Sequence, residues 1–432
     1  MAHIVVLGAG LNGLSTALVL AHDGHPVTVL ERDPAEPKGD AEDLWQNWER
    51  PGVSQFRLPH LMLARWRRLM EQELPEVIDE LERLGGHRLS PLDVLPTAFT
   101  GGLRASDEEM RTMQARRPVV EGALAAVAAR TPGVVVRRGT KAEALATGTA
   151  AGRGVPHVSG VVTDGGEVIP ADLVVDAMGR RTPTNRMLEA AGAHRPDEQR
   201  DDLGFVYYCR HFRNNSGRSH PVANDLSHHE GLSLLRIPAD ADTFSWSLVV
   251  ASNDRDMRRL RDVEAWERAL ALFPDTQALR AAATPITDIQ VMSGAEDRRR
   301  SFVVDGEPVV TGLVAVGDAA VRTNPSLGRG SSIGLTQVCT LRDVLREVGP
   351  DRPAELARRF AEAIDAVVRP MYQATLDFDR HRMAEVQADI ARHALPARRW
   401  VLDPAAGTRA SCSAGRRSAA HRPAPELQPR AP

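Results

Sequence analysis

The chain has 432 residues, of which 42% are hydrophobic and 26% charged, and its formal net charge at pH 7 is -3. This composition is typical of a soluble globular protein with room for about two or three domains. The near-neutral charge gives no reason to expect nucleic acid or an anionic membrane as a partner. Three widely separated cysteines predict neither a disulfide framework nor a zinc site, and they suit the cytoplasm. No apolar run reaches the roughly 20 residues that span a bilayer, so we expect no stable membrane insertion.

The first elements in chain order form a strand–helix–strand unit. Residues 4–7 and 27–30 are short apolar runs typical of buried strands, and residues 14–22 have helical spacing. The first run leads directly into glycines, so we do not expect a signal peptide. Residues 34–59 are polar and interrupted by prolines, which predicts a loop. The next expected helices are residues 61–84, broken at Pro75, and residues 118–129.

The pattern of residue types changes near Asp201. Before this point the expected strands are residues 134–138, 158–164 and 173–177, with a glycine-rich hairpin loop near 148–154. After it, residues 204–213 and 232–252 alternate and are rich in aromatic and β-branched residues, which predicts a separate antiparallel sheet. The remaining expected elements are a helix at 263–272, a strand at 313–316 and helices at 333–348 and 353–384. The tail has almost no large apolar residue, so we expect either disorder or an altered reading frame.

A glycine-rich turn follows the first strand and carries the clearest motif. Gly8, Gly10 and Gly13 form the spacing Gly-x-Gly-x-x-Gly, and Glu31 ends the next strand about 18 residues later, as dinucleotide-binding βαβ units require. Gly8 permits a tight turn, Gly10 lets the backbone approach a pyrophosphate, and Gly13 lets the helix pack close to the strand. The helix N-terminus then presents N–H groups to the phosphates, and Glu31 can accept ribose hydroxyls. We therefore predict a dinucleotide site.

A second segment favours FAD over NAD as that dinucleotide. The strand at 313–316 is followed by Gly-Asp-Ala-Ala at 317–320, and then by a glycine-rich stretch at 328–332 that opens a helix. Asp318 can accept a sugar-alcohol hydroxyl, and the N–H groups after it can face an anion or the electron-rich edge of a ring. A dehydrogenase that binds only NAD does not need this second segment.

On these two segments, the sequence resembles the flavin-dependent monooxygenases of the para-hydroxybenzoate hydroxylase type, over roughly residues 3–400. Within that group it is more similar to the branch of epoxidases and halogenase-like oxidoreductases. The resemblance implies an α/β plus β fold, in which an FAD-binding Rossmann domain of the glutathione-reductase type is interrupted by an antiparallel β-sheet substrate domain and followed by C-terminal helices. The expected domains are 1–195 (FAD-binding, first part, with part of the substrate sheet allowed), 196–300 (substrate-binding β domain), 301–350 (FAD-binding, second part), 351–402 (C-terminal helices) and 403–432 (disordered tail).

The resemblance also implies which residues contact FAD. The expected contacts are Gly8, Gly10, Gly13, Glu31, Arg32, Arg50, Arg117, Asp318, Pro325, Gly328 and Gly330. Arg50 lies in a segment similar to the family's Arg-x-Gly-Val and would approach the pyrophosphate, for which an arginine is well suited. Arg117 would lie near the flavin, and Pro325, Gly328 and Gly330 beside the isoalloxazine. His60 either lies near the flavin or substrate or is structural. The sequence identifies no catalytic residue and no metal site.

Two family features are absent or altered. Met178 stands where the family's NAD(P)H-linked Asp-Gly motif has its Asp, so either NAD(P)H reduces the flavin directly or a separate flavin reductase supplies reduced flavin or electrons. Halogenases of this fold use a catalytic lysine and a Trp-x-Trp stretch. Lys38 and Lys141 lie in the wrong places for that lysine, and Trp246 has no partner two positions away. These departures argue against halogenation.

The expected function follows from the resemblance. It is an FAD-dependent monooxygenase that inserts one oxygen atom from O2 into a hydrophobic small molecule of secondary metabolism, by epoxidation or hydroxylation through a flavin C4a-hydroperoxide. The alternatives are an FAD-dependent reductase or dehydrogenase similar to geranylgeranyl reductases, which needs no O2, a halogenase-like protein, and a flavin-loaded binding or scaffolding protein.

The substrate side is expected on the antiparallel sheet. Phe205, Tyr207 and Phe244 occupy positions there that are typical of either core or pocket. The histidines of this region are expected at the surface; they are His211, His220, His228 and His229.

Overall fold

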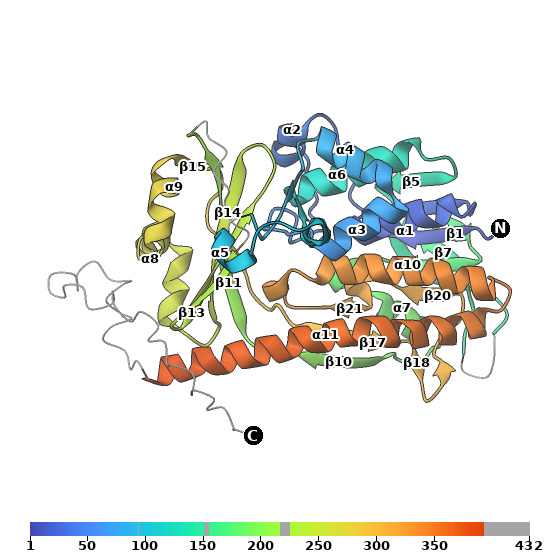
Figure 1. Ribbon diagram of the computed structural model, residues 1–432. Coiled ribbons are helices and arrows are strands. Elements are labelled where there is room, and N and C mark those ends of the chain that lie inside the picture. The colour runs from blue at the N-terminus through green and yellow to red at the C-terminus, as the bar shows by residue number, and fades with distance from the viewer. Residues whose placement is uncertain (94, 151–154, 217–224, 393–432) are drawn as a thin grey trace, which may run out of the picture.

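The computed structural model describes residues 1–93, 95–150, 155–216 and 225–392 (Figure 1). The expected tail at 403–432, residues 151–154 of the predicted hairpin loop and His220 lie outside the described residues. The described part is a mixed α/β structure with several sheets, of which a five-stranded parallel sheet and a larger antiparallel sheet are the two main ones. No helix in the described ranges is long and apolar enough to cross a membrane.

The parallel sheet forms around the first predicted strand. In spatial order its strands are β20 (Leu313–Ala315), β9 (Leu173–Asp176), β1 (Ile4–Leu7), β2 (Val27–Glu31) and β5 (Val134–Arg138). All residues of β1, β9 and β20 are buried, as expected for parallel strands with both faces covered. Ile4 lies opposite both Val27 and Leu173, so β1 is central. Because β20 joins this sheet late in the chain, residues far apart in sequence meet at one sheet edge.

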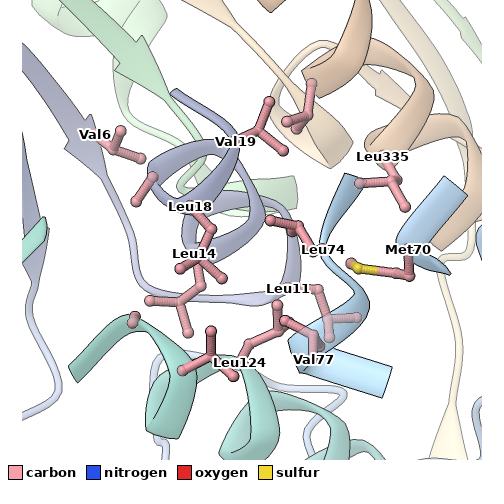
Figure 2. Packing of buried hydrophobic residues seen from close by; sticks show 14 of the residues in the cluster. Val6, Leu11, Leu14, Leu18, Val19, Met70, Leu74, Val77, Leu124 and Leu335 are labelled. Atoms are coloured by element: carbon pink, nitrogen blue, oxygen red, sulfur yellow. The ribbon is translucent and has the colours of Figure 1, made fainter. Parts of the chain in front are cut away.

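Helices cover the parallel sheet, and α1 (Leu11–His22) is the most enclosed of them. Figure 2 shows Leu14 and Leu18 of α1 packed among side chains from α3 (Ala64–Glu73), α4 (Pro75–Arg83), α6 (Arg117–Arg130) and α10 (Gly330–Val348). Both α1 and α6 are apolar on nearly all sides, which is typical of helices buried between layers. The N-terminus of α1 is therefore fixed in place by packing.

The antiparallel sheet has the order β12-β13-β14-β11-β15, and β16 also pairs with β11. Its strands are β11 (Phe205–Asn214), β12 (Asp225–His229), β13 (Leu232–Pro238), β14 (Thr243–Ala251), β15 (Ala283–Pro285) and β16 (Gln290–Met292). The predicted range 232–252 is thus two strands joined by a tight turn in which Ala241 and Asp242 have positive φ values of 52° and 53°. Helix α8 (Val263–Leu270) covers one face, where Trp266 packs against Phe212.

Helix α11 (Pro353–Arg392) runs along both main sheets (Figure 1). Near its C-terminal end Arg382 donates to the carbonyl oxygens of Leu232 and His229, at 2.7 and 2.8 Å, and to Ser233 Oγ at 3.1 Å. These bonds attach the helix to the turn between β12 and β13. The helix is eight residues longer than predicted, because nothing in 385–392 stops it and its inner face still has this turn to contact.

Other predicted bounds need small corrections. Helix α10 begins at Gly330, three residues before the predicted start at 333. The predicted loop 34–59 contains helix α2 (Ala41–Gln46), which starts because Asp40 caps it by accepting from the N–H groups of Glu42 and Asp43. Pro75 does divide the predicted helix 61–84, into α3 and α4.

The remaining elements are short. The strands are β3 (His87–Leu89), β4 (Thr112–Gln114), β6 (Ala142–Thr147), β7 (Val158–Thr163), β8 (Val168–Pro170), β10 (Asp197–Asp201), β17 (Asp297–Ser301), β18 (Val303–Val304), β19 (Glu307–Pro308) and β21 (Val321–Arg322). The helices are α5 (Thr97–Thr100), α7 (Thr184–Ala190) and α9 (Gln277–Ala281).

Candidate functional site

A cavity of about 460 Å³ lies between the carboxyl ends of β1, β9 and β20 and one face of the antiparallel sheet. Ligands of open α/β sheets bind at such strand ends. The structure brings ten of the eleven predicted contact residues together around this cavity: Gly8, Gly10, Glu31, Arg32, Arg50, Arg117, Asp318, Pro325, Gly328 and Gly330. Gly13 lies behind the cavity wall instead. The contacts that these residues would make with a cofactor stay predictions.

Each of the three glycines of the first turn is favoured for a different structural reason. Gly8 has φ +99°, and a Cβ there would lie 2.9 Å from the Ala177 carbonyl oxygen. A Cβ on Gly13 would lie only 1.8 Å from the Gly8 carbonyl oxygen, so helix and strand could not approach as they do. A Cβ on Gly10 would meet nothing within 4 Å, because it would point into open space. Gly10 is also the N-cap of α1 and provides no side-chain cap, which leaves first-turn N–H groups for a phosphate.

Glu31 is buried at the end of β2 and organises the turn. Its Oε2 accepts from the Ala9 N–H at 2.8 Å, and its Oε1 accepts from the Asp33 N–H at 2.9 Å. Arg50 donates its Nη2 to the same Oε2. Neighbouring Arg32 instead donates to the Gly52 carbonyl oxygen at 2.9 Å. Oε2 thus already accepts two hydrogen bonds, whereas Oε1 accepts one and has further lone-pair capacity, to which a ribose hydroxyl can donate.

A line of four buried charged groups leads from Glu31 to the half-buried His60. We call this line the buried charge chain: Glu31, Arg50, Glu121, Arg117 and His60. Arg50 donates one terminal nitrogen to Glu31 and the other to Glu121. Arg117 donates its Nε to Glu121 Oε1 at 2.7 Å, and its Nη1 lies 3.0 Å from His60 Nε2. Except for Glu121, all members line the cavity.

The pKa directions agree with this arrangement. Burial works to raise the pKa of Glu121, but Arg117 and Arg50 outweigh it, so the pKa is lowered and Glu121 is ionised. Burial and the Arg117 charge lower the pKa of His60 to about 3. His60 is therefore neutral, so its Nε2 accepts from Arg117, and its Nδ1 donates to the Leu58 carbonyl oxygen at 2.8 Å. The role predicted for Arg50 changes in one respect: its guanidinium already lies between two carboxylates.

The second predicted segment meets the first one at Asn12. A Cβ on Gly317 or Gly334 would lie 2.2 or 2.3 Å from the Asn12 side chain, so any larger residue at either position would require the Asn12 amide to move. The Gly317 N–H donates to Gln337 Oε1 at 2.5 Å. After Asp318 the chain forms a short 3-10 helix, Pro325–Leu327, which ends at Gly328 with φ +63° before α10 starts. This places Pro325, Gly328 and Gly330 on one wall of the cavity.

The antiparallel sheet supplies the apolar wall of the cavity. Its lining residues are mostly apolar, with one acidic residue at the edge of the sheet: Tyr207, Cys209, Asp225, Leu226, Leu235, Ile237, Ser247 and Met292. Of the three aromatic candidates, Tyr207 lines the cavity, whereas Phe205 and Phe244 are buried in the hydrophobic cores. His228 and His229 are exposed, as predicted.

The prediction that His211 lies at the surface is wrong. It is buried with its ring 5.0 Å from Trp45, because it points inward on β11, and burial lowers its pKa to about 3.

Sequence reasoning missed a buried polar network beside the wall formed by Pro325. Tyr207 Oη donates to Asn324 Oδ1 at 2.8 Å, and Asn324 Nδ2 donates to Asp379 Oδ2 at 3.0 Å. The Asn324 N–H donates to Asp297 Oδ1 at 2.8 Å. Burial raises the pKa of Asp297 to about 7, and Asp379 adds to the effect. Asp379 lies inside a helix predicted only from its spacing, so no local pattern identified it.

The comparisons with known proteins agree with this geometry. Residues 3–72 match the family model described as FAD dependent oxidoreductase. Protein Rv3254 of Mycobacterium tuberculosis is 27% identical over 387 residues, covering 86% of this chain and 78% of its own.

Two solved structures have a similar fold. PqsL, a probable FAD-dependent monooxygenase from Pseudomonas aeruginosa, has a TM-score of 0.62 at 18% identity, covering 90% of this chain and 99% of its own. CmlS, a flavin-dependent halogenase, has a TM-score of 0.60 at 16% identity, covering 86% and 62%.

These findings define the class of protein. The chain is an FAD-dependent oxidoreductase, and its fold is similar to that of FAD-dependent monooxygenases and flavin-dependent halogenases.

The different surroundings of Gly10 and Gly13 give a matched pair of variants. We expect Gly10→Ala to fold normally and to bind FAD at least about tenfold more weakly, because its methyl group points to where the backbone must approach a phosphate. We expect Gly13→Ala to lower the melting temperature strongly. Circular dichroism and FAD fluorescence titration measure both effects. Normal FAD affinity in Gly10→Ala would contradict the assignment.

Burial of neutral His60 predicts an acid-dependent loss of stability. Its pKa is about 3 in the folded protein against an ordinary 6.5, so the unfolded state takes up the proton first as the pH falls. The stabilising contribution is complete above pH 6.5 and declines toward pH 3. His60→Gln, which can still accept from Arg117, should make this decline shallower by up to about 1.4 kcal/mol per pH unit. Denaturant unfolding across this pH range measures it. An unchanged slope, equal to that of exposed His381→Gln, contradicts the prediction.

Proposed function

We propose that the protein is an FAD-dependent monooxygenase that inserts one oxygen atom from O2 into an apolar small molecule, by hydroxylation or epoxidation. The observation that carries this proposal is the division of one cavity into two parts. One part has the features of a dinucleotide site, the other has an apolar sheet wall, and the Pro325–Gly330 stretch lies between them. FAD, when bound, supplies the redox chemistry.

The dinucleotide part fits FAD in its chemistry. The uncapped start of α1 suits the pyrophosphate, Glu31 suits the ribose, and Asp318 suits the ribityl hydroxyls. In this proposal Arg117 contacts the cofactor near the ring. Arg50 borders the ribose and pyrophosphate end, with both terminal nitrogens also donating to Glu31, Glu121 and the Ala9 carbonyl oxygen. Pro325, Gly328 and Gly330 form the surface beside the ring. Glu121, which does not line the cavity, is outside these contacts.

The apolar part defines the substrate class. Leu226, Leu235, Ile237 and Met292 present hydrocarbon or thioether surface, and Ser247 and Tyr207 add hydroxyl groups. Burial raises the pKa of Cys209 to about 12, so its thiol is neutral and belongs to the apolar surface. PqsL has been determined in complex with the small molecule 2-aminobenzoylacetate, which supports a small organic substrate here.

The finer domain plan is also part of the proposal. The chain starts in the FAD-binding domain (1–195), inserts the substrate sheet (196–300) and returns to the first domain (301–350). The pairing of β20 with β9 in the sheet of β1 supports this return. The C-terminal helices at 351–402 follow in this plan.

Electrons come from NAD(P)H or from a partner flavin reductase. Met178 lines the cavity, and its backbone N–H donates to Asp176 Oδ1 at 2.9 Å. An acidic residue at position 178 could make the same backbone hydrogen bond, so the difference lies in the side chain. The thioether of Met178 supplies no carboxylate to this turn. This favours the partner reductase.

The alternatives have less support. Among the described residues that line the cavity, Lys141 is the one lysine, and the adjacent Thr140 N–H donates to the Glu31 carbonyl oxygen at 2.9 Å. Lys141 is therefore at the ribose end, and its ammonium group is paired with Glu143, which argues against a halogenase. A reductase that works without O2 would use the same cavity, so oxygen dependence separates it from the monooxygenase.

Anaerobic spectroscopy tests the proposal. We expect purified protein to bind FAD and to show the visible bands of oxidised flavin. Addition of NAD(P)H alone should leave the bands almost unchanged, and addition of a flavin reductase should bleach them. Air should then restore them within seconds. Reduced flavin that persists in air would favour the O2-independent reductase, and a protein that takes up no FAD would contradict the proposal.

A further inference from the structure

The middle of the buried charge chain is a carboxylate that lies outside the cavity. Glu121 is on the first turns of α6 and is fully buried, with Gly122 packed against Leu44 of α2 beside it. It is the one acidic residue of a helix that is otherwise mostly alanine and valine. Burying a carboxylate is unfavourable unless it is paired, so a helix with this composition has no packing reason to contain one.

The two partners of Glu121 face different parts of the cavity. Arg50 donates to Glu121 Oε2 and also to Glu31 at the ribose end. Arg117, held by Oε1 at 2.7 Å, reaches His60 at the other end. A guanidinium has a planar set of five donors, so fixing one edge fixes the direction of the others. Glu121 thus contributes to the orientation of both arginines. It is the carboxylate partner of Arg117, whereas Arg50 is also held by Glu31, Asp33 and the Ala9 carbonyl oxygen.

The formal charges within the buried charge chain also balance, and Glu121 supplies one of its two negative charges. Two carboxylates, two guanidinium groups and a neutral imidazole sum to zero when Glu121 is ionised. Without its charge, Arg117 loses its carboxylate partner, whereas Arg50 keeps Glu31 and, at 3.7 Å from its Nε, Asp33. The pKa of Arg50 is raised, because Glu121 and Glu31 together outweigh the opposing effect of burial.

We propose that Glu121 is a positioning residue for the cofactor, which holds Arg50 at the ribose end and Arg117 at the flavin end in the orientations that bind FAD. This rests on the proposed FAD site. Glu121 acts through the two arginines and touches neither cofactor nor substrate.

A buried carboxylate elsewhere in the chain offers a matched control. Asp240, in the turn between β13 and β14, is fully buried and accepts from Arg116 Nε and Nη2 at 2.9 and 2.6 Å. Neither Asp240 nor Arg116 lines the cavity. Asp240→Asn should therefore lower stability through the same kind of lost ion pair without changing the cofactor contacts.

The test is equilibrium binding of two probes, FAD and ADP, to full-length variants at a temperature where circular dichroism shows all of them folded. ADP reaches only the ribose and pyrophosphate end. Glu121→Gln should raise the Kd for FAD at least about tenfold and should also raise the Kd for ADP, because a charge-assisted hydrogen bond is lost at each end. Arg117→Gln should raise the Kd for FAD and leave that for ADP unchanged. Asp240→Asn should lower the melting temperature and leave both Kd values unchanged.

Each other pattern contradicts the proposal. Equal FAD affinity in wild type and Glu121→Gln would refute the positioning role of Glu121 without contradicting the proposed FAD site. A rise for FAD that Asp240→Asn reproduces shows a general effect of stability. Wild-type protein that binds neither probe refutes the proposed function itself, and this outcome is distinct because it appears before any variant is compared.

Discussion

The structure of the site depends on the pairing of Arg50 with two buried carboxylates. Glu31 comes from β2, Glu121 from α6 and Arg50 from the segment between α2 and α3, so one guanidinium joins three parts of the chain. Breaking one partner of such a buried pair typically costs about 3–5 kcal/mol, since it leaves an uncompensated charge. The pairing is also next to the glycine turn, where Arg50 Nη1 donates to the Ala9 carbonyl oxygen at 2.8 Å. At the proposed cofactor site, FAD binding and folding would therefore use the same interactions.

The parts of the fold that could be predicted were those with local patterns. The strand, glycine turn and helix at 4–22 were predicted because apolar runs and Gly8, Gly10 and Gly13 each have a local physical reason. The antiparallel sheet was predicted from alternation. The split into β13 and β14 was missed, since the turn at Ala241 and Asp242 contains no glycine. Helix α2 was missed because Asp40 caps a short helix within a polar stretch. The domain boundaries stay predictions.

In the candidate site, too, the residues that belong to local sequence motifs could be predicted and the others could not. The predicted contacts gathered around one cavity because both motifs end buried parallel strands, whose carboxyl ends meet at one edge. Glu121, Asn324 and Asp379 could not be found in this way, since a partner of each lies far away in sequence: Arg50 for Glu121, and Asn324 and Asp379 for each other. A charged residue inside the alanine-rich helix α6 was the one local sign of Glu121. His211 was misjudged because the sequence did not show which face of β11 was covered.

A crystal structure of the protein with FAD would test the central claim most directly. We expect the ribose hydroxyls at Glu31, the pyrophosphate at the start of α1 beside Gly10, and the isoalloxazine ring between the Pro325–Gly330 stretch and the wall formed by Tyr207 and Leu235. Unfilled space should remain on the sheet side of the ring for the substrate. A cofactor bound elsewhere, or a ring that fills the apolar part and leaves no room for a substrate, would contradict it.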